Sequence, residues 1–151
     1  MSKIAQRQVV ARINPSTNGN IVAPPGVGED LGLSYFAQVT GGEITASVEK
    51  IYIGGRKFPE VLCAPAEVGD ITLTRHYSRD IDGDFLTSLR PLVGQAYYDV
   101  SVVELNCDVA DPKTMRLYSQ ALLVGLTEPE GDAASGAPAT YSLTFSVQSV
   151  K

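Results

Sequence analysis

Apolar and polar residues alternate along several segments of the chain, most regularly near the C-terminus. There, hydroxyl or amide side chains separate an apolar set: Tyr141, Leu143, Phe145 and Val147. A period of two is typical of a strand that buries one face, because successive side chains point to opposite sides of a sheet. The segment 140–150 is therefore predicted to be a strand with one face on a core.

Similar patterns predict further strands. Ile71 and Leu73 alternate with polar residues over 70–77, and short apolar runs bounded by Gly, Pro, Asn or Asp indicate strands over four other segments: 7–13, 34–40, 97–106 and 116–127. The segment 42–55 also alternates, but its apolar phase slips by one residue. Such a slip moves the apolar set to the other face, so we expect a β-bulge near Glu49–Lys50 or a strand that changes packing surface.

One short helix is expected, over 82–94. Asp82 or Asp84 is suited to cap its N-terminus, and an apolar stripe and two stop residues follow: Phe85, Leu86, Leu89, Pro91 and Gly94. Three segments are predicted as loops because they are long and rich in Gly, Pro, Asn or acidic residues: 14–34, 54–70 and 127–140. Since long loops in a compact domain are usually functional or disordered, these three suggest an assembly surface.

Composition narrows the possible functions. The chain has 151 residues, 44% of them hydrophobic and 19% charged, which is typical of a single globular domain with its own core. The formal net charge of -5 does not provide the basic surface with which proteins hold nucleic acid. Cys63 and Cys107 lack a CxxC spacing and predict two ordinary thiols. No segment resembles a secretion signal or a membrane span, so we expect synthesis in the cytoplasm without membrane insertion.

Candidate chemistry gathers around Arg75, His76, Tyr77 and Asp80. His76 is the only histidine, and adjacent strand residues point to opposite faces, so these side chains cannot all converge on one substrate. The stretch DIDGD, 80–84, resembles the start of a calcium loop, but it lacks the glycine and the glutamate that an EF-hand needs at its sixth and twelfth positions. We therefore expect no catalytic residue, no metal site and no cofactor, that is, no enzyme.

The order of these elements resembles a known family. The stretch FAQVTGGEITASVEKIYIGG is followed by the long link RKFPEVLCAPAEVG, by DITLTR, by one short helix and by YYDVSVVELNCDVADPKTMRLYSQALLVGLT. This arrangement covers most of the chain and is similar to the tail tube proteins, or major tail proteins, of tailed bacteriophages. It is also similar to the tube proteins of type VI secretion systems and contractile bacteriocins. The resemblance implies a mainly β fold, an antiparallel β-sandwich or half-barrel with one short flanking α-helix.

The resemblance also implies a function. Tube proteins close hexameric rings that stack into a tube, so we expect a structural virion protein of the tail, assembled in the host cytoplasm, whose tube is the conduit for genome delivery. Its expected partners are other copies of itself, a tape-measure protein, and a tail-tip or baseplate initiator and terminator, with DNA passing through unbound. The alternatives are a subunit of a type VI or bacteriocin-like injection system and, from another class, a small ligand-binding β-barrel, which would need an apolar cavity.

The resemblance implies one tail-tube domain over 1–151. Within this domain, two sets of residues are candidates for functional positions. Polar strand positions are candidates for the lumen wall, where hydroxyls and carboxylates would keep DNA hydrated and mobile: Thr45, Ser47, Glu49, Asp70, Thr72, Thr74, Asp99 and Ser101. The loop 54–70 is the candidate contact with the neighbouring ring, through Arg56, Lys57, Phe58, Glu60, Val61 and Leu62. The N-terminal arm, 14–34, could serve an adjacent subunit in the same way.

Overall fold

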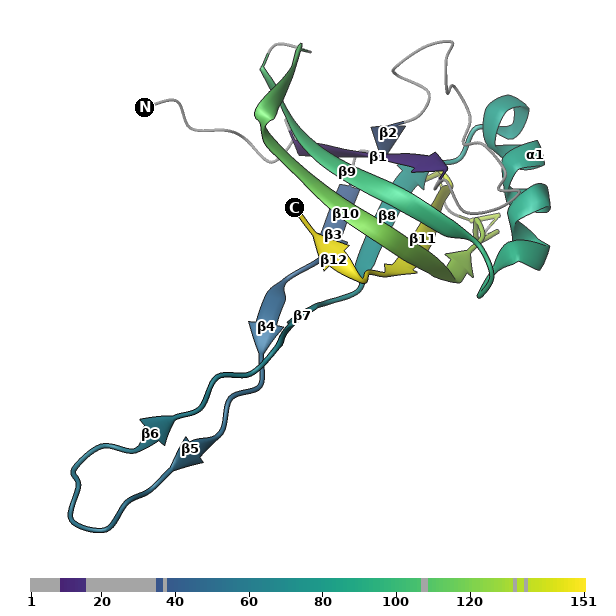
Figure 1. Cartoon of the computed structure of the whole chain (residues 1–151). Coiled ribbons are helices and arrows are strands. Elements are labelled where there is room, and N and C mark those ends of the chain that lie inside the picture. The colour runs from purple at the N-terminus through teal and green to yellow at the C-terminus, as the bar shows by residue number, and fades with distance from the viewer. Residues whose placement is uncertain (1–8, 16–34, 37, 107–108, 132, 135) are drawn as a thin grey trace.

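A computed structural model describes residues 9–15, 35–36, 38–106, 109–131, 133–134 and 136–151. Most of them form antiparallel strands, and there is one α-helix (Figure 1). The strands of the main sheet are β1 (Val9–Pro15), β2 (Tyr35–Phe36), β3 (Gln38–Gly41), β8 (Ile71–His76), β9 (Tyr97–Asn106), β10 (Val109–Thr127), β11 (Thr140–Ser146) and β12 (Ser149–Val150). The helix α1 (Arg79–Leu89) continues into a short 3-10 helix, η3 (Arg90–Leu92).

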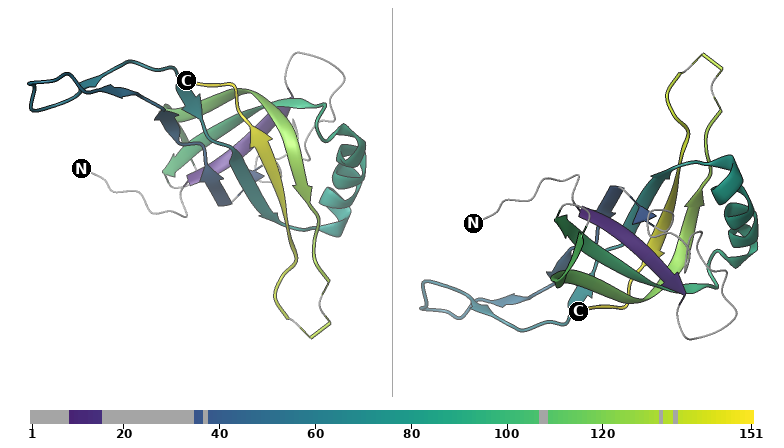
Figure 2. Two further views of the ribbon diagram at one scale, coloured as in Figure 1. Left: turned by 90° about the horizontal axis from the view of Figure 1, so that it is seen from below. Right: turned by 90° about the horizontal axis from the view of Figure 1, so that it is seen from above.

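The main sheet curls into a half-barrel. Its strand order is β2-β1-β9-β10-β11-β8-β3, with β12 beside β10. In Figure 1, β1, β9 and the first part of β10 form one layer that crosses over β3, β8 and β11, and the two ends of the sheet approach each other where β1 lies near β3. α1 covers one end of the half-barrel (Figure 2). The predicted fold class, mainly β with one flanking helix, is therefore confirmed.

The core lies between the two layers and under the helix. The alternation predicted over 140–150 is present: Tyr141, Leu143 and Phe145 are buried, while the residues between them are half-buried. Register carries this pattern across the sheet, since Leu73 of β8 lies opposite Leu143 on one side and Val39 on the other. From α1, three apolar side chains reach the same core: Phe85, Leu86 and Leu89.

The helix starts earlier than predicted, and its cap is different. The N-cap residue is Ser78, and neither Asp82 nor Asp84 caps the helix. Asp82 lies in the first turn with its side chain fully buried, where it accepts hydrogen bonds from the Ser78 backbone N–H at 2.9 Å and from the Tyr141 hydroxyl at 3.0 Å. The predicted cap was wrong because the Asp82 carboxylate is already hydrogen-bonded to Tyr141 of β11 and to the backbone of Ser78.

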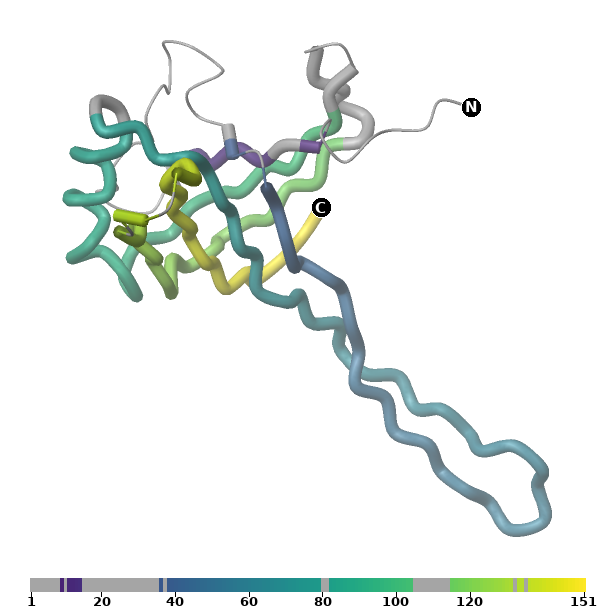
Figure 3. The backbone as a smooth tube through the Cα atoms, turned by 180° about the vertical axis from the view of Figure 1, so that it is seen from behind, coloured from purple at the N-terminus to yellow at the C-terminus, as the bar shows by residue number. Residues whose placement is uncertain are grey.

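The segment 42–70 forms a long hairpin that projects from the half-barrel, here called the arm (Figures 1 and 3). Its strands pair two by two: β4 (Ile44–Ala46) with β7 (Ala66–Val68), and β5 (Lys50–Ile51) with β6 (Glu60–Val61). The predicted strand over 42–55 is thus interrupted at 47–49, near the expected bulge, and the predicted loop over 54–70 contains two strands. The outgoing limb continues β3 and the returning limb leads into β8.

Glycines set the junction between arm and half-barrel. Gly41 and Gly42 have φ angles of 86° and 80°, in the left-handed region that side chains rarely adopt. A β-carbon at Gly41 would collide with the backbone carbonyl of Asp70, and one at Gly42 would lie 2.9 Å from the Tyr118 hydroxyl oxygen. A second glycine pair, Gly54–Gly55, forms the turn at the tip of the arm.

We expect the substitution Gly41→Ala to lower the free energy of unfolding by about 2–3 kcal/mol, because it combines a disfavoured φ with a clash against the backbone beside β8. Gly54→Ala is the matched control: its β-carbon meets nothing within 4 Å, and we expect a change within about 0.5 kcal/mol. Urea unfolding followed by circular dichroism measures both. Equal stabilities of the two variants would contradict this account of the junction.

Two buried tyrosines make the fold sensitive to alkaline pH. Burial raises the pKa of Tyr98 to about 12. Burial, and then the charge of Asp82, raise the pKa of Tyr141 as well. Because ionisation is easier in the unfolded chain, at a pKa of about 10, the stability from these groups is complete below that pH and is lost as pH rises toward 12.

We expect the free energy of unfolding to fall above about pH 10 by about 1.4 kcal/mol per pH unit for each of these tyrosines. Urea titrations between pH 8 and pH 11 measure the slope. Tyr98→Phe should reduce the slope, whereas the exposed Tyr52→Phe should leave it unchanged. A slope that is the same in Tyr98→Phe as in the wild type would contradict the assignment.

Candidate assembly surfaces

Arg75, His76 and Tyr77, considered above as candidates for catalysis, lie at the end of β8 and directly after it, and their side chains point to two different faces. Arg75 points toward the core side, where its guanidinium lies 3.8 Å from the Asp82 carboxylate, and Tyr77 packs edge-on against Tyr141 with ring centroids 6.3 Å apart. His76, between them, is exposed on the other face. These contacts tie β8, β11 and α1 together, so they support the fold at this end of the half-barrel.

The two described carboxylates of the acidic stretch 80–84, Asp82 and Asp84, do not share a common site either. Asp82 is buried among its hydrogen-bond partners, while Asp84 is exposed on α1. Among the residues that the structure describes, no group of three His, Cys, Asp or Glu side chains is arranged to hold a metal ion. The described carboxylates of this stretch therefore have structural or surface positions.

The arm carries most of the exposed apolar surface. Tyr52 is 79% exposed, Phe58 75% and Ile44 61%, and further large apolar side chains of the arm are exposed too: Val48, Ile51, Ile53, Val61 and Leu62. No described helix is long and apolar enough to cross a membrane. A monomer seldom displays a contiguous apolar patch without a use, so the arm has the character of a docking surface.

The six candidate contact residues lie at the tip and on the returning limb of the arm. Arg56, Lys57 and Phe58 follow the tip turn, with the Lys57 ammonium 5.6 Å from the centre of the Phe58 ring. Glu60 and Val61 form β6, and the Leu62 N–H donates to the Glu49 carbonyl at 2.8 Å. All six residues are exposed.

Sequence reasoning missed the outgoing limb. The strand predicted over 42–55 has Ile44, Val48 and Ile53 in its apolar set, whereas the structure exposes all three on the arm. The available signal was the glycine pairs at both ends of the segment, 41–42 and 54–55, which bracket a strand whose apolar phase slips. Together they indicate a hairpin that leaves the sheet.

A second surface is the polar face of β3, β8 and β11, here called the hydroxyl face. Thr72 lies opposite Thr40 on one side and Thr144 on the other, and Thr74 lies in the same way between Gln38 and Ser142. Residues directly opposite each other share a face, so these side chains form a row of hydroxyl and amide groups on the side away from the core. All of them are half-buried or exposed.

The structure distributes the eight candidate lumen residues over three places. Thr72 and Thr74 belong to the hydroxyl face, and Asp70 directly precedes β8 at its arm end. Asp99 and Ser101 lie on β9, in the other layer, where Asp99 accepts a hydrogen bond from the Gln120 N–H at 3.3 Å. The remaining three are exposed on the arm: Thr45, Ser47 and Glu49. The three groups therefore do not form one continuous wall within a single copy.

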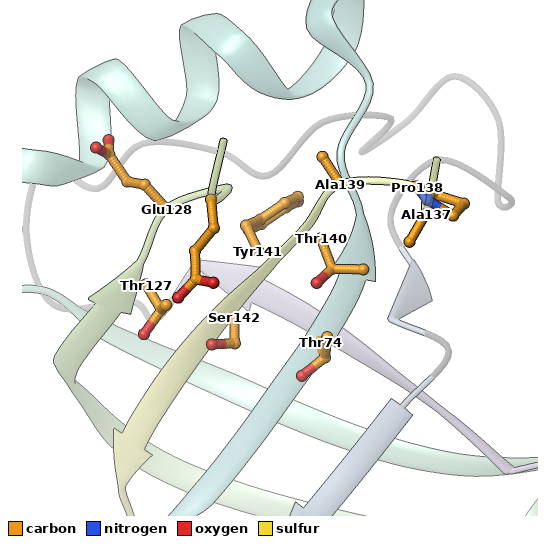
Figure 4. Close-up of a pocket in the computed structure, with 10 residues that line it drawn as sticks. Thr74, Thr127, Glu128, Ala137, Pro138, Ala139, Thr140, Tyr141 and Ser142 are labelled. Atoms are coloured by element: carbon orange, nitrogen blue, oxygen red, sulfur yellow. The ribbon is translucent and has the colours of Figure 1, made fainter. Parts of the chain in front are cut away.

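A groove of about 530 Å³ lies at the helix end of the half-barrel (Figure 4). It is bounded by Thr74 of β8, by the start of β11, and by the connection 127–140 between β10 and β11, which projects from the half-barrel (Figure 2). Glu128 and Glu130 contribute carboxylates, and Arg90 pairs with Glu128. Ala137, Pro138 and Ala139 contribute exposed apolar side chains, and Tyr141 borders the groove while its ring is buried in the core. The connection was predicted to be acidic, but the groove beneath it was not predicted.

The N-terminal segment 14–34, predicted to contact an adjacent subunit, lies almost entirely outside the described residues, which omit 16–34. Cys107 also lies outside them. Cys63 is exposed on the returning limb of the arm.

No protein-family model matches this sequence, and no curated protein does. Solved structures do match its fold. A chain of the anti-feeding prophage (AFP) baseplate superposes with a TM-score of 0.71 at 19% identity, covering 100% of this chain and 96% of that one. A chain of the PVC sheath-tube complex, from an extracellular contractile injection system in its extended state, gives 0.69 at 18%, with 99% and 90% covered. An Hcp protein gives 0.53 at 12%, with 94% and 90% covered.

These likenesses define the class of fold. The chain has the half-barrel fold found in contractile injection systems, and over nearly its whole length. The likeness to tube-type proteins that the order of elements predicted is thereby confirmed at the level of the fold. At these identities the matches concern the fold, and the surfaces described above must carry any statement about function.

The exposed position of the arm residues predicts that they contribute little to the stability of a single copy. We expect Tyr52→Ser and Phe58→Ser each to change the free energy of unfolding of the monomer by less than about 0.5 kcal/mol. Leu73→Ala, in the buried core, should cost about 2–5 kcal/mol. Urea unfolding at low protein concentration compares the three. A large loss in the arm variants would mean that the arm folds back onto its own half-barrel.

Proposed function

We propose that this chain is a structural, non-enzymatic subunit that assembles into stacked hexameric rings and so forms the tube of a tail-like particle. The observation that carries the proposal is the arm, a projecting hairpin with its apolar side chains exposed. Buried between copies, those side chains would leave water, and the free energy gained would hold the assembly together. The contact residues on the arm are Arg56, Lys57, Phe58, Glu60, Val61 and Leu62, acting on the neighbouring ring.

The open edges of the half-barrel support ring closure. β2 and β3, separated by one residue, end the main sheet, and each has one side without a strand partner among the described residues. Pairing edges between neighbouring copies removes them, as full closure does in a barrel. Because different patches meet in such a contact, it is head-to-tail, and head-to-tail contacts generate rings and stacks.

The hydroxyl face is our candidate for the lumen wall, with Thr72 at its centre and Thr74 at its rim, where the groove begins. The strands β10, β11, β8 and β3 lie side by side. If each copy of a hexameric ring gives four of them, a barrel of about 24 strands, spaced about 4.8 Å and tilted about 40°, has a backbone diameter of roughly 48 Å. Hydroxyl groups and the net negative charge would let DNA pass without binding it.

Two kinds of particle fit this subunit. In the first, the tube is a phage tail that delivers a genome, built on a tape-measure protein in the host cytoplasm and incorporated into the virion. The second is an extracellular contractile injection system, favoured because the PVC structure comes from such a particle. In either case a baseplate-like initiator and a cap-like terminator are expected partners.

Electron microscopy of the purified protein at high concentration, with size-exclusion chromatography alongside, tests the proposal. We expect hollow tubes or six-membered rings, formed spontaneously or on a baseplate complex. The variant Tyr52→Ser with Phe58→Ser should remain monomeric, because it removes apolar contact area without unfolding the half-barrel. A wild-type protein that stays monomeric even with the baseplate complex would overturn the proposal. Particles purified from producing cells distinguish the two kinds, since phage virions carry DNA-filled heads.

A further inference from the structure

The arm and the groove lie at opposite ends of one strand. The arm joins β8 at Ile71, whereas the groove lies beside Thr74 and the start of β11, where the Tyr77 N–H donates to the Ala139 carbonyl at 2.9 Å. From Ile44 to Ile53 the outgoing limb spans roughly 30 Å at about 3.3 Å per residue, and it runs away from α1 (Figures 1 and 3). The tip therefore cannot enter the groove of its own copy.

The two surfaces are complementary in charge. Segment 50–60 at the end of the arm carries three cations and one carboxylate: Lys50, Arg56, Lys57 and Glu60. The connection 127–140 contains no lysine or arginine. Within the described residues Glu128 is partly neutralised by Arg90, while no cation pairs with Glu130. Glu130 is thus the carboxylate that is available to an incoming basic group.

They are also complementary in polarity. Phe58, next to Arg56 and Lys57, is 75% exposed, and the groove offers it the apolar side chains of Ala137, Pro138 and Ala139, all three of which are exposed. A volume of about 530 Å³ is within the range of sites that enclose a drug-sized molecule, so it has room for a few side chains. The neighbouring depression along α1 is less suited, because Arg79 and Arg90 line it together with Asp84 and Glu128, so it has no surplus of negative charge to attract the tip.

We propose that the arm tip of one copy, through Arg56, Lys57 and Phe58, docks in the acidic groove beside Glu130 of a second copy. The inference rests on the proposed function and names the receptor surface for the arm. Since the tip and the groove are different patches at opposite ends of the folded molecule, each copy donates a tip and receives one. Such a contact repeats without closing on itself and stacks copies along one direction.

A charge-reversal cycle tests the docking. We expect Lys57→Glu and Glu130→Lys each to reduce the rate of tube elongation at least about tenfold, because like charges then meet in the groove, and their combination to restore most of it. Asp84→Lys is the matched control: it makes the same charge change on α1, outside the groove, and should elongate like the wild type. Circular dichroism and thermal unfolding verify that each variant is folded.

Normal elongation by Glu130→Lys, together with loss in Lys57→Glu, would overturn the groove as the receptor and leave the proposed function standing. So would a double variant that is no better than either single one. An effect of Asp84→Lys equal to that of Glu130→Lys would point to the depression along α1 and equally overturn the proposal.

A cross-linking measurement keeps the inference testable if no tubes form. In a background of Cys63→Ser and Cys107→Ser, copies carrying Phe58→Cys are mixed with differently tagged copies carrying Ala137→Cys and oxidised. We expect the mixed disulfide dimer to form at least about tenfold faster than with Ser88→Cys, an exposed position on α1, because docking raises the effective concentration of the two thiols. A selective dimer without tubes would support docking while contradicting tube formation, and equal rates would overturn the docking.

Discussion

The pairing of β8 on both of its edges is the constraint on which the rest of the structure depends. Its six residues lie between β11 and β3, and the register puts Leu73 opposite the buried Leu143 on one side and the half-buried Val39 on the other. Because the side-chain period is two, that register also decides which residues face away from the core. The same register therefore places Thr72 and Thr74 on the hydroxyl face, on the opposite side of the sheet from the core.

β8 also determines what lies at each end of the half-barrel. At its start, Gly41 and Gly42 turn the neighbouring strand out of the sheet and the arm begins. Beyond its end, Asp82 accepts hydrogen bonds from Ser78 and Tyr141, which fixes the helix over the core. The projecting hairpin and the helix-covered end are therefore held at a separation of one strand length, which gives the molecule two unlike ends.

Strict alternation was enough to predict most of the half-barrel from the sequence. The strand over 97–106 has the predicted bounds, and the apolar faces of 71–76 and 140–146 lie in the core as expected. The helix was found, but not its start, because the partners of Asp82 come from a strand far away in sequence. The arm was only partly recognised, since exposed apolar residues in a hairpin follow the same pattern as buried ones. The groove joins segments that only the tertiary fold brings together.

The glycine junction has a consequence for the mechanics of any assembly built from this chain. Two adjacent residues without side chains connect the arm to the half-barrel, and the backbone hydrogen bonds across the junction run from Gly42 to Asp70 and from Gly69 to Glu43. The junction is held by these bonds and by the Tyr118 hydroxyl, which donates to the Gly42 carbonyl at 3.4 Å, so bending there strains far fewer contacts than bending within the half-barrel, which disturbs its core. In a filament whose layers are linked through the arms, pitch and flexural stiffness would be set at this joint, and each layer would move as a rigid disc.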